Sequence, residues 1–282
     1  MEFGETIKKI RRSQRLSQQD LAKGVMSRSN LSRFESGQYY PSYDKVFGLI
    51  AKLGLSLEEV LYIANDYQAK PLDVLQRKLV EYDNQYDLEG LKEISKEAKQ
   101  SFQETANPEY QTLYWFAQLS FLHLGHVDEL PEEAIKGSIL PYFEDKEDWY
   151  LKDLRFLNNS LAIFELDDAC FLGNRALKSF EKYQQFNVQT NLQSNLMINL
   201  GTRCFEEKRY SESLSYFQRA KAFSTSFNHV YNQIICANYL LILEGGATEQ
   251  LETYLATLEL LGYHETVAYL RQVKDTFQPS LS

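Results

Sequence analysis

The side chains with the clearest chemistry lie near the N-terminus, in the string LSQQDLAKGVMSRSNLSRFESG at residues 16–37. A polar opening leads into a short apolar-periodic stretch that breaks at Gly24, and a second polar opening starts another stretch that ends at Gly37. This layout is typical of a helix-turn-helix, which places its second helix in the DNA major groove. Arg28 and Asn30 open that helix. Arginine can bond guanine O6/N7 and asparagine can bond adenine N6/N7.

Five short helices are expected to hold this string in one compact domain. They are predicted over residues 4–14, from Ser17, from Ser27, from residues 41–42 to Gly54, and from Ser56 to near residue 65. Ser17 and Ser27 are more plausible as helix caps than as base readers. Glu35 is expected to be a structural acid that pairs with Arg11 on the first helix.

Residues 4–63 resemble the lambda-repressor-like helix-turn-helix class through the motifs SQQDLA and SRFESG. In the register of that class, Arg28, Ser29 and Asn30 face base edges, and Arg33 stays on the groove-facing side. Phosphate contacts are expected at the starts of the second and fourth helices. The resemblance therefore implies these DNA-binding residues: Gln18, Arg28, Ser29, Asn30, Arg33, Ser42 and Lys45.

The charge of the chain divides into a basic head and an acidic body. The net charge of the 282 residues is −9, which alone would argue against a DNA-binding protein. Residues 1–45, however, carry nine Lys and Arg against five Asp and Glu, a net +4 that leaves −13 for the rest. Attraction to phosphate is therefore local to the head, and the acidic body is expected to have another task.

The rest of the chain is predicted to be an array of helical hairpins. Only six prolines and 13 glycines interrupt the whole chain, and alternate breaks in this part lie roughly 35–45 residues apart, the range of helical solenoids. The segment LGTRCFEEKRYSESLSYFQRA at residues 200–220 resembles a tetratricopeptide repeat. Small residues (Gly201, Ser213, Ala220) are expected where two helices cross closely, and large ones (Leu200, Phe217) between repeats. An irregular helical bundle is the alternative.

The whole chain resembles the Rgg/GadR/MutR transcriptional regulators of Gram-positive bacteria. The strings GETIKKIRRSQRLSQQDLA, SRSNLSRFESGQYYPS and SLEEVLYIANDYQ carry this resemblance. It implies an all-α protein, with a five-helix DNA-binding domain at residues 1–65, a linker at 66–70, and a right-handed α-solenoid of repeats at 71–282. It also implies a cytoplasmic homodimer that binds double-stranded DNA and a short signalling peptide, with RNA polymerase as a further candidate partner.

A row of asparagines supports a peptide groove independently of the resemblance. Asn187, Asn191, Asn195 and Asn199 recur every four positions, so along a helix they would form one polar stripe. An asparagine amide offers both a donor and an acceptor to a peptide backbone. Further asparagines lie on the equivalent helices of the neighbouring pairs, and related receptors use such positions. The predicted peptide-binding residues are Arg155, Asn158, Asn159, Asn195, Asn199, Tyr231 and Asn232.

The sequence leaves one alternative for the asparagines and two for the function. The asparagines can belong to a solvated face. The protein can be a ligand-independent repressor whose repeats bind another protein, or a toxin–antitoxin or phage-type module whose repeats serve only oligomerisation. An open, asparagine-lined groove would favour the peptide receptor over both of these functions.

No other motif supports catalysis, a cofactor or a membrane span. The pair His123 and His126 has no further ligand motif nearby, so a metal site is not expected. Cys170, Cys204 and Cys236 are widely spaced and form no CxxC pair, so we expect reduced, buried thiols in a cytosolic protein. The sequence does not decide whether a cysteine or histidine has a sensing role.

Overall fold

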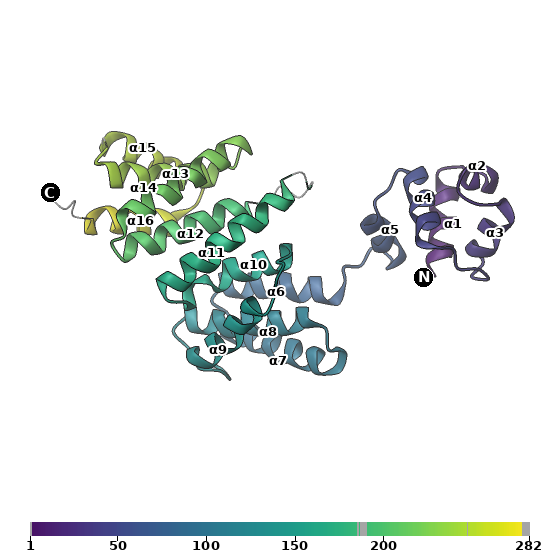
Figure 1. The fold of residues 1–282 in the computed structure, drawn as a ribbon, viewed down its shortest axis with the longest axis horizontal. Helices are drawn as coiled ribbons and strands as arrows, with labels where there is room; N and C mark the ends of the chain where they lie inside the picture. The colour runs from purple at the N-terminus through teal and green to yellow at the C-terminus, as the bar shows by residue number, and fades with distance from the viewer. Residues whose placement is uncertain (1, 185, 187–190, 247, 278–282) are drawn as a thin grey trace. The chain divides into compact units, whose positions relative to one another are not determined.

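The computed structural model describes residues 2–184, 186, 191–246 and 248–277, and within these ranges every regular element is a helix (Figure 1). The predicted all-α fold is confirmed. The chain divides into two compact units, Met1–Glu81 and Tyr82–Ser282. None of the helices in the described ranges is long and apolar enough to span a membrane.

Five helices build most of the N-terminal unit: α1 (Phe3–Ser13), α2 (Gln18–Ala22), α3 (Arg28–Glu35), α4 (Tyr43–Leu53) and α5 (Leu57–Ala64). The Oγ atoms of Ser17, Ser27 and Ser56 each accept a backbone N–H of the following helix. These bonds satisfy donors that the first turn of a helix leaves free. Gly54 ends α4 in the left-handed conformation. The predicted helix starts are confirmed.

The core of this unit forms from the inward faces of all five helices. Ile7, Leu31, Leu49 and Val60 are fully buried in it. Helix α1 approaches α3 so closely that a Cβ atom at Gly4 would lie 2.0 Å from the carbonyl oxygen of Phe34. Only glycine fits there, so the first helix sets the position of the third.

The remaining helices form successive antiparallel pairs of a TPR-like solenoid (Figure 1). Helix α6 (Pro71–Asn84) spans the division between the units. The helices that follow are α7 (Leu88–Thr105), α8 (Pro108–His123), α9 (Glu132–Glu144), α10 (Leu151–Ser160), α11 (Leu166–Phe180), α12 (Leu192–Glu206), α13 (Tyr210–Ser226), α14 (Val230–Glu244), α15 (Thr248–Leu260) and α16 (His264–Thr276).

Small residues set the spacing of α11, α12 and α13, as the repeat pattern predicts. A Cβ atom at Gly201 would lie 3.0 Å from the ring of Phe217, and one at Gly173 would lie 2.6 Å from the side chain of Leu200. The Ser213 hydroxyl donates a buried hydrogen bond of 2.8 Å to the carbonyl oxygen of Gly201. The large residues therefore fill the space that the glycines leave between helices.

Candidate functional site

The predicted base-reading side chains lie at the N-terminal end of α3, which follows α2 after a tight turn. The caps at Ser17 and Ser27 fix where the two helices begin, and Gly24, with a φ of +78°, turns the chain between them. Arg28 and Ser29 are exposed at the start of α3, whereas Asn30 is half-buried. The sequence therefore leaves two of the three predicted base readers free of the domain core.

Arg33 lies one turn further along α3 and is exposed. Its guanidinium carbon lies 6.0 Å from the centre of the Tyr39 ring. This distance is typical of a weak cation–π contact, which restrains the long side chain without removing its charge.

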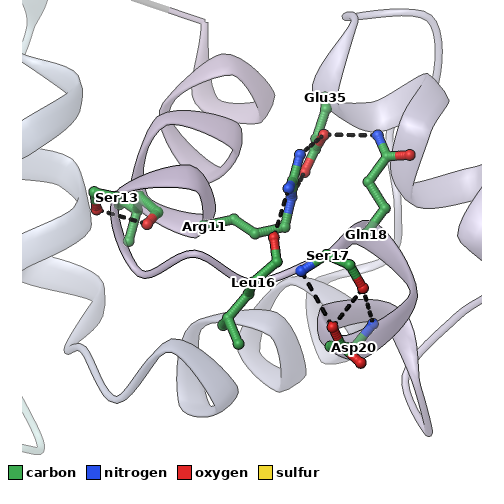
Figure 2. Close-up of polar contacts among 8 residues, drawn as sticks. Arg11, Ser13, Leu16, Ser17, Gln18, Asp20 and Glu35 are labelled. Atoms are coloured by element: carbon green, nitrogen blue, oxygen red, sulfur yellow. Dashed lines mark hydrogen bonds and ion pairs between the residues drawn. The ribbon is translucent and has the colours of Figure 1, made fainter.

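A buried ion pair locks α3 against α1. The Nε atom of Arg11 lies 2.6 Å from one oxygen of Glu35, and its Nη2 atom lies 2.8 Å from the other. Both side chains are buried, and the remaining Nη1 atom donates to the carbonyl oxygen of Leu16 (Figure 2). Burial raises the pKa of Glu35, but the hydrogen bonds from Arg11 and Gln18 outweigh it, and the net pKa lies below its ordinary value. The predicted pairing of Arg11 with Glu35 is confirmed.

Gln18 joins the same network instead of standing free. Its Nε2 atom donates a 2.9 Å hydrogen bond to Glu35, so its side chain points toward α3 (Figure 2). A contact from this side chain to the DNA backbone would come from the amide edge that this bond leaves free. Gln18, the first residue of α2, therefore links this helix to Glu35, the last residue of α3.

Lys52 is a supporting residue that the sequence did not suggest. It lies on α4, and its Nζ atom donates to the carbonyl oxygens of Asp20, Leu21 and Lys23 at 2.7, 3.1 and 2.6 Å. These carbonyls lie at the C-terminal end of α2, where a helix leaves its acceptors unsatisfied and carries partial negative charge. Lys52 therefore caps the five-residue helix α2 from another element.

The predicted phosphate contacts lie at the start of α4. Ser42 is exposed at the N-cap position, and Lys45 is half-buried in the first turn. A hydrogen bond from the Ser42 side chain lowers the pKa of the neighbouring Asp44. Tyr40 and Tyr43 flank this site with 78% and 77% of their surface exposed. Hydroxyl, ammonium and phenol groups therefore share one exposed edge, next to one carboxylate.

Asparagines connect α10 to α12 in the C-terminal unit. The Nδ2 atom of Asn199 lies 3.2 Å from Oδ1 of Asn158, and Asn158 in turn donates to Asn159 at 3.1 Å. Arg155, one turn earlier on α10, is exposed, and its side chain makes no hydrogen bond or ion pair with the described part of the chain. The structure thus brings four of the predicted peptide-binding residues onto one face.

A second asparagine bridge connects α12 to α14. The Nδ2 atom of Asn232 donates to Oδ1 of Asn195 at 2.7 Å and to the Ser194 hydroxyl at 2.8 Å. Asn232 is buried, whereas Asn195 is half-buried. Amide side chains therefore link α10 to α12 and α12 to α14.

Tyr231 lies apart from these bridges. Its ring is 4.6 Å from that of Tyr263, and its hydroxyl is 3.3 Å from that of Thr266, so it contacts the start of α16. Its exposed fraction is 37%. A role in peptide binding would use the exposed part of the ring.

The predicted stripe of four asparagines on one helix is shorter in the structure. Helix α12 begins at Leu192, so only Asn195 and Asn199 lie within it, and Asn191 occupies the N-cap position. Asn187 lies outside the described residues. The four-residue spacing therefore holds within α12 for Asn195 and Asn199 alone, and their role in peptide binding stays a prediction.

Two features of the C-terminal unit concern the histidines and cysteines. His123 and His126 line a pocket of about 330 Å³ with Tyr86, Leu88 and Leu124. The carboxylate of Asp128, close to them in sequence, accepts a hydrogen bond of 3.0 Å from Gln118.

The sulfur atoms of Cys170 and Cys204, 34 residues apart in sequence, lie 3.8 Å from each other. Their wide spacing in the sequence gave no sign of this contact.

Comparisons with known proteins match both units. A family model described as "HTH-type transcriptional regulator Rgg, C-terminal domain" matches residues 77–272, and a helix-turn-helix model matches residues 7–60. A crystal structure of a candidate transcriptional regulator from Listeria monocytogenes EGD-e has a TM-score of 0.80 at 22% identity, covering 98% of this chain and 99% of that chain.

Two further solved structures share the fold. The Streptococcus dysgalactiae SHP pheromone receptor Rgg2 has a TM-score of 0.76 at 16% identity, covering 97% of this chain and 99% of that one. Bacillus thuringiensis PlcR, crystallised with the peptide PapR7 and DNA, has a TM-score of 0.70 at 20% identity, covering 95% and 98%. At these identities the likeness concerns the fold alone.

Proposed function

Because the chain belongs to the Rgg family of helix-turn-helix transcriptional regulators, we propose that it binds promoter DNA as a homodimer under the control of a short signalling peptide. The family consists of transcriptional regulators, not enzymes. The proposal places the DNA-binding domain at residues 1–65, a linker at 66–70 and the regulatory and dimerisation domain at 71–282, in the cytoplasm. RNA polymerase remains a further candidate partner.

Exposed polar groups at the start of α3 support DNA reading. Arg28 and Ser29 stand free of the core, and Arg33 follows one turn later. The network of Arg11, Glu35 and Gln18 holds α3 so that these side chains enter a groove together. One such module has limited affinity at physiological salt, which favours a dimer on two half-sites.

The single observation that carries the peptide half of the proposal is the amide face of α10, α12 and α14. Each bridge uses only part of its amides. Nδ2 of Asn195 and Oδ1 of Asn199 make no hydrogen bond to any residue that the structure describes. A donor and an acceptor on neighbouring turns match the alternating N–H and C=O groups of an extended peptide. Structures of the same fold include a pheromone receptor and a complex with peptide and DNA.

Fluorescence anisotropy on the promoter next to the protein's own gene tests the DNA half. Arg28→Ala should weaken binding by about 1–3 kcal/mol, roughly 5- to 150-fold, because it removes one bidentate base contact. Arg12→Ala is the matched control, since Arg12 is an exposed arginine on α1 that is not among the predicted DNA-binding residues. Equal effects of both substitutions, or no binding to any neighbouring promoter, would refute the assignment.

Calorimetric titration with synthetic peptides encoded by neighbouring short reading frames tests the peptide half. Asn195→Ala and Asn199→Ala should each reduce affinity, whereas Asn174→Ala should not, because Asn174 is an exposed asparagine on α11 that bonds Tyr216. Unchanged affinity in both groove variants would remove this site. DNA binding that no peptide alters would favour the ligand-independent repressor.

A further inference from the structure

Two cysteine thiols meet between α11 and α12. The Sγ atoms of Cys170 and Cys204 lie 3.8 Å apart, which is a hydrogen-bonding contact between thiols. Cys204 is fully buried, whereas Cys170 keeps 7% of its surface exposed. The close approach of Gly173 to Leu200 holds the same two helices together one turn further along. The two sulfurs therefore face each other, and Cys170 belongs to the less deeply buried of the two residues.

Polar groups around the pair favour a thiolate on the more accessible sulfur. The hydrogen bond from the Cys204 thiol lowers the pKa of Cys170 to about 7, although burial acts in the opposite direction. The same hydrogen bond raises the pKa of Cys204, and burial adds to the shift. Tyr216, whose hydroxyl accepts from the Nδ2 atom of Asn174 at 3.0 Å, also lowers the pKa of Cys170 through a side-chain hydrogen bond.

A metal ion is the other chemistry that this cluster suggests, because a carboxylate oxygen of Glu212 lies within 4.8 Å of both sulfurs. Both Glu212 oxygens, however, are already bonded to Arg209, at 2.6 and 2.5 Å. Two thiolates and one carboxylate also fall short of the four protein ligands of a structural zinc site. The arrangement therefore favours reaction between the thiols over metal binding.

We propose that Cys170 and Cys204 are an oxidation site, at which a peroxide converts the two thiols into an intramolecular disulfide. The Cys170 thiolate attacks one peroxide oxygen, the O–O bond breaks, and hydroxide leaves and takes up a proton to form water. The resulting Cys170 sulfenic acid is attacked by the Cys204 sulfur: the S–S bond forms, the S–O bond breaks, and a second water carries away the Cys204 proton. The peroxide is reduced by two electrons and the thiol pair is oxidised by two.

Cys236 provides a control within the same chain. It lies on α14, is fully buried, and burial raises its pKa to about 12. A thiol that stays protonated reacts poorly with peroxide. Peroxide should therefore oxidise Cys170 and Cys204 and leave Cys236 as a free thiol. The disulfide would join α11 to α12 covalently.

The test treats the full-length protein with hydrogen peroxide, alkylates it after unfolding, and maps the peptides by mass spectrometry without reduction. We expect a Cys170–Cys204 linked peptide, a mass loss of about 2 Da from the two hydrogens removed, and an alkylated Cys236. Dithiothreitol should restore three alkylated cysteines. Alkylation of all three after peroxide treatment, or equal oxidation of Cys236, would overturn the proposal.

Two cysteine-to-alanine variants, with Cys236→Ser as their control, show which sulfur attacks the peroxide. With Cys204→Ala, peroxide should leave a sulfenic acid on Cys170 that dimedone traps, because the second thiol is missing. With Cys236→Ser, disulfide formation should be unchanged. Dimedone labelling at Cys204 in a Cys170→Ala variant at the same rate would contradict the assigned roles. Retention of zinc by the untreated protein, with thiols that resist peroxide until a chelator is added, would replace the oxidation site by a metal site. All of these measurements can be made without DNA or peptide, so they test the oxidation site separately from the proposed function.

Discussion

Replacing Glu35 with alanine would remove the acid that holds α3 against α1. The Glu35 side chain is only 1% exposed and that of Arg11 only 8%, so the substitution leaves a guanidinium buried without a counter-charge. Gln18 also loses its acceptor. Removing one partner of a buried ion pair typically costs about 3–5 kcal/mol. We expect the N-terminal unit to lose stability of this size.

Hydrogen exchange of the full-length chain, followed by mass spectrometry, measures this loss locally. Peptides from α1 and α3 should exchange roughly 150- to 5,000-fold faster in Glu35→Ala, the ratio that corresponds to the expected cost. Peptides from α12 to α14 serve as the internal reference. Glu58→Ala, at an exposed acid on α5, is the matched control. An acceleration below about fivefold would place the pair among exposed ion pairs and refute the reasoning.

Three further predictions concern the same unit. The pKa of Glu35 is lowered in the folded chain, so its contribution to folding stability is fully present above its ordinary pKa of 4.5 and is lost as the pH falls through the lowered value. Glu35→Gln should therefore flatten the pH dependence of hydrogen exchange in α3. Lys52→Met should cost about 1 kcal/mol, seen as faster exchange in α2, because three carbonyls lose an exposed charged donor. Gly4→Ala should cost about 1–3 kcal/mol, seen as faster exchange in α1 and α3, because the new methyl group meets the carbonyl of Phe34.

Matched control substitutions show whether the loss of stability comes from the contacts of Gly4 and Lys52 or from any substitution of the same type. Gly137→Ala also places a methyl group on a helical glycine, but nothing lies within 4 Å of it, so it should not destabilise its helix. Lys45→Met removes a lysine from the same helix as Lys52, and α2 should keep its protection. A loss in either control as large as that in its partner would argue against the contacts assigned here. An unchanged pH dependence in Glu35→Gln would argue against Glu35 as the acid-sensitive group.

Local signals predicted the helix-turn-helix well. Caps at Ser17 and Ser27 act within three residues of themselves, so the sequence alone reveals them. The pairing of Arg11 with Glu35 was also predictable, since both lie in one recognisable domain pattern. Lys52 was missed because its bonds reach 29–32 residues back, onto carbonyls that every residue type offers.

Contacts between repeats were harder to predict for a related reason. The pairing of Cys170 with Cys204 depends on the register of α11 against α12, which helix periodicity within each segment does not determine. The asparagine row was predicted from its spacing, but the bonds from Asn199 to Asn158 and from Asn232 to Asn195 were not. An amide that can satisfy a peptide can equally satisfy a neighbouring amide.

Those bridges sort the amide atoms of this face into two kinds. Nδ2 of Asn195 and Oδ1 of Asn199 bond no residue that the structure describes, whereas Oδ1 of Asn195 is held by Asn232. An extended chain that took over the bridged acceptor of Asn195 would release Asn232, whose buried amide would keep only the Ser194 hydroxyl. A hydrogen bond gained at a bridged atom would thus be exchanged for one lost, so its net gain would be small. Under the proposed function, affinity for a peptide backbone would therefore come mainly from the two unbridged atoms, and discrimination between peptides from their side chains.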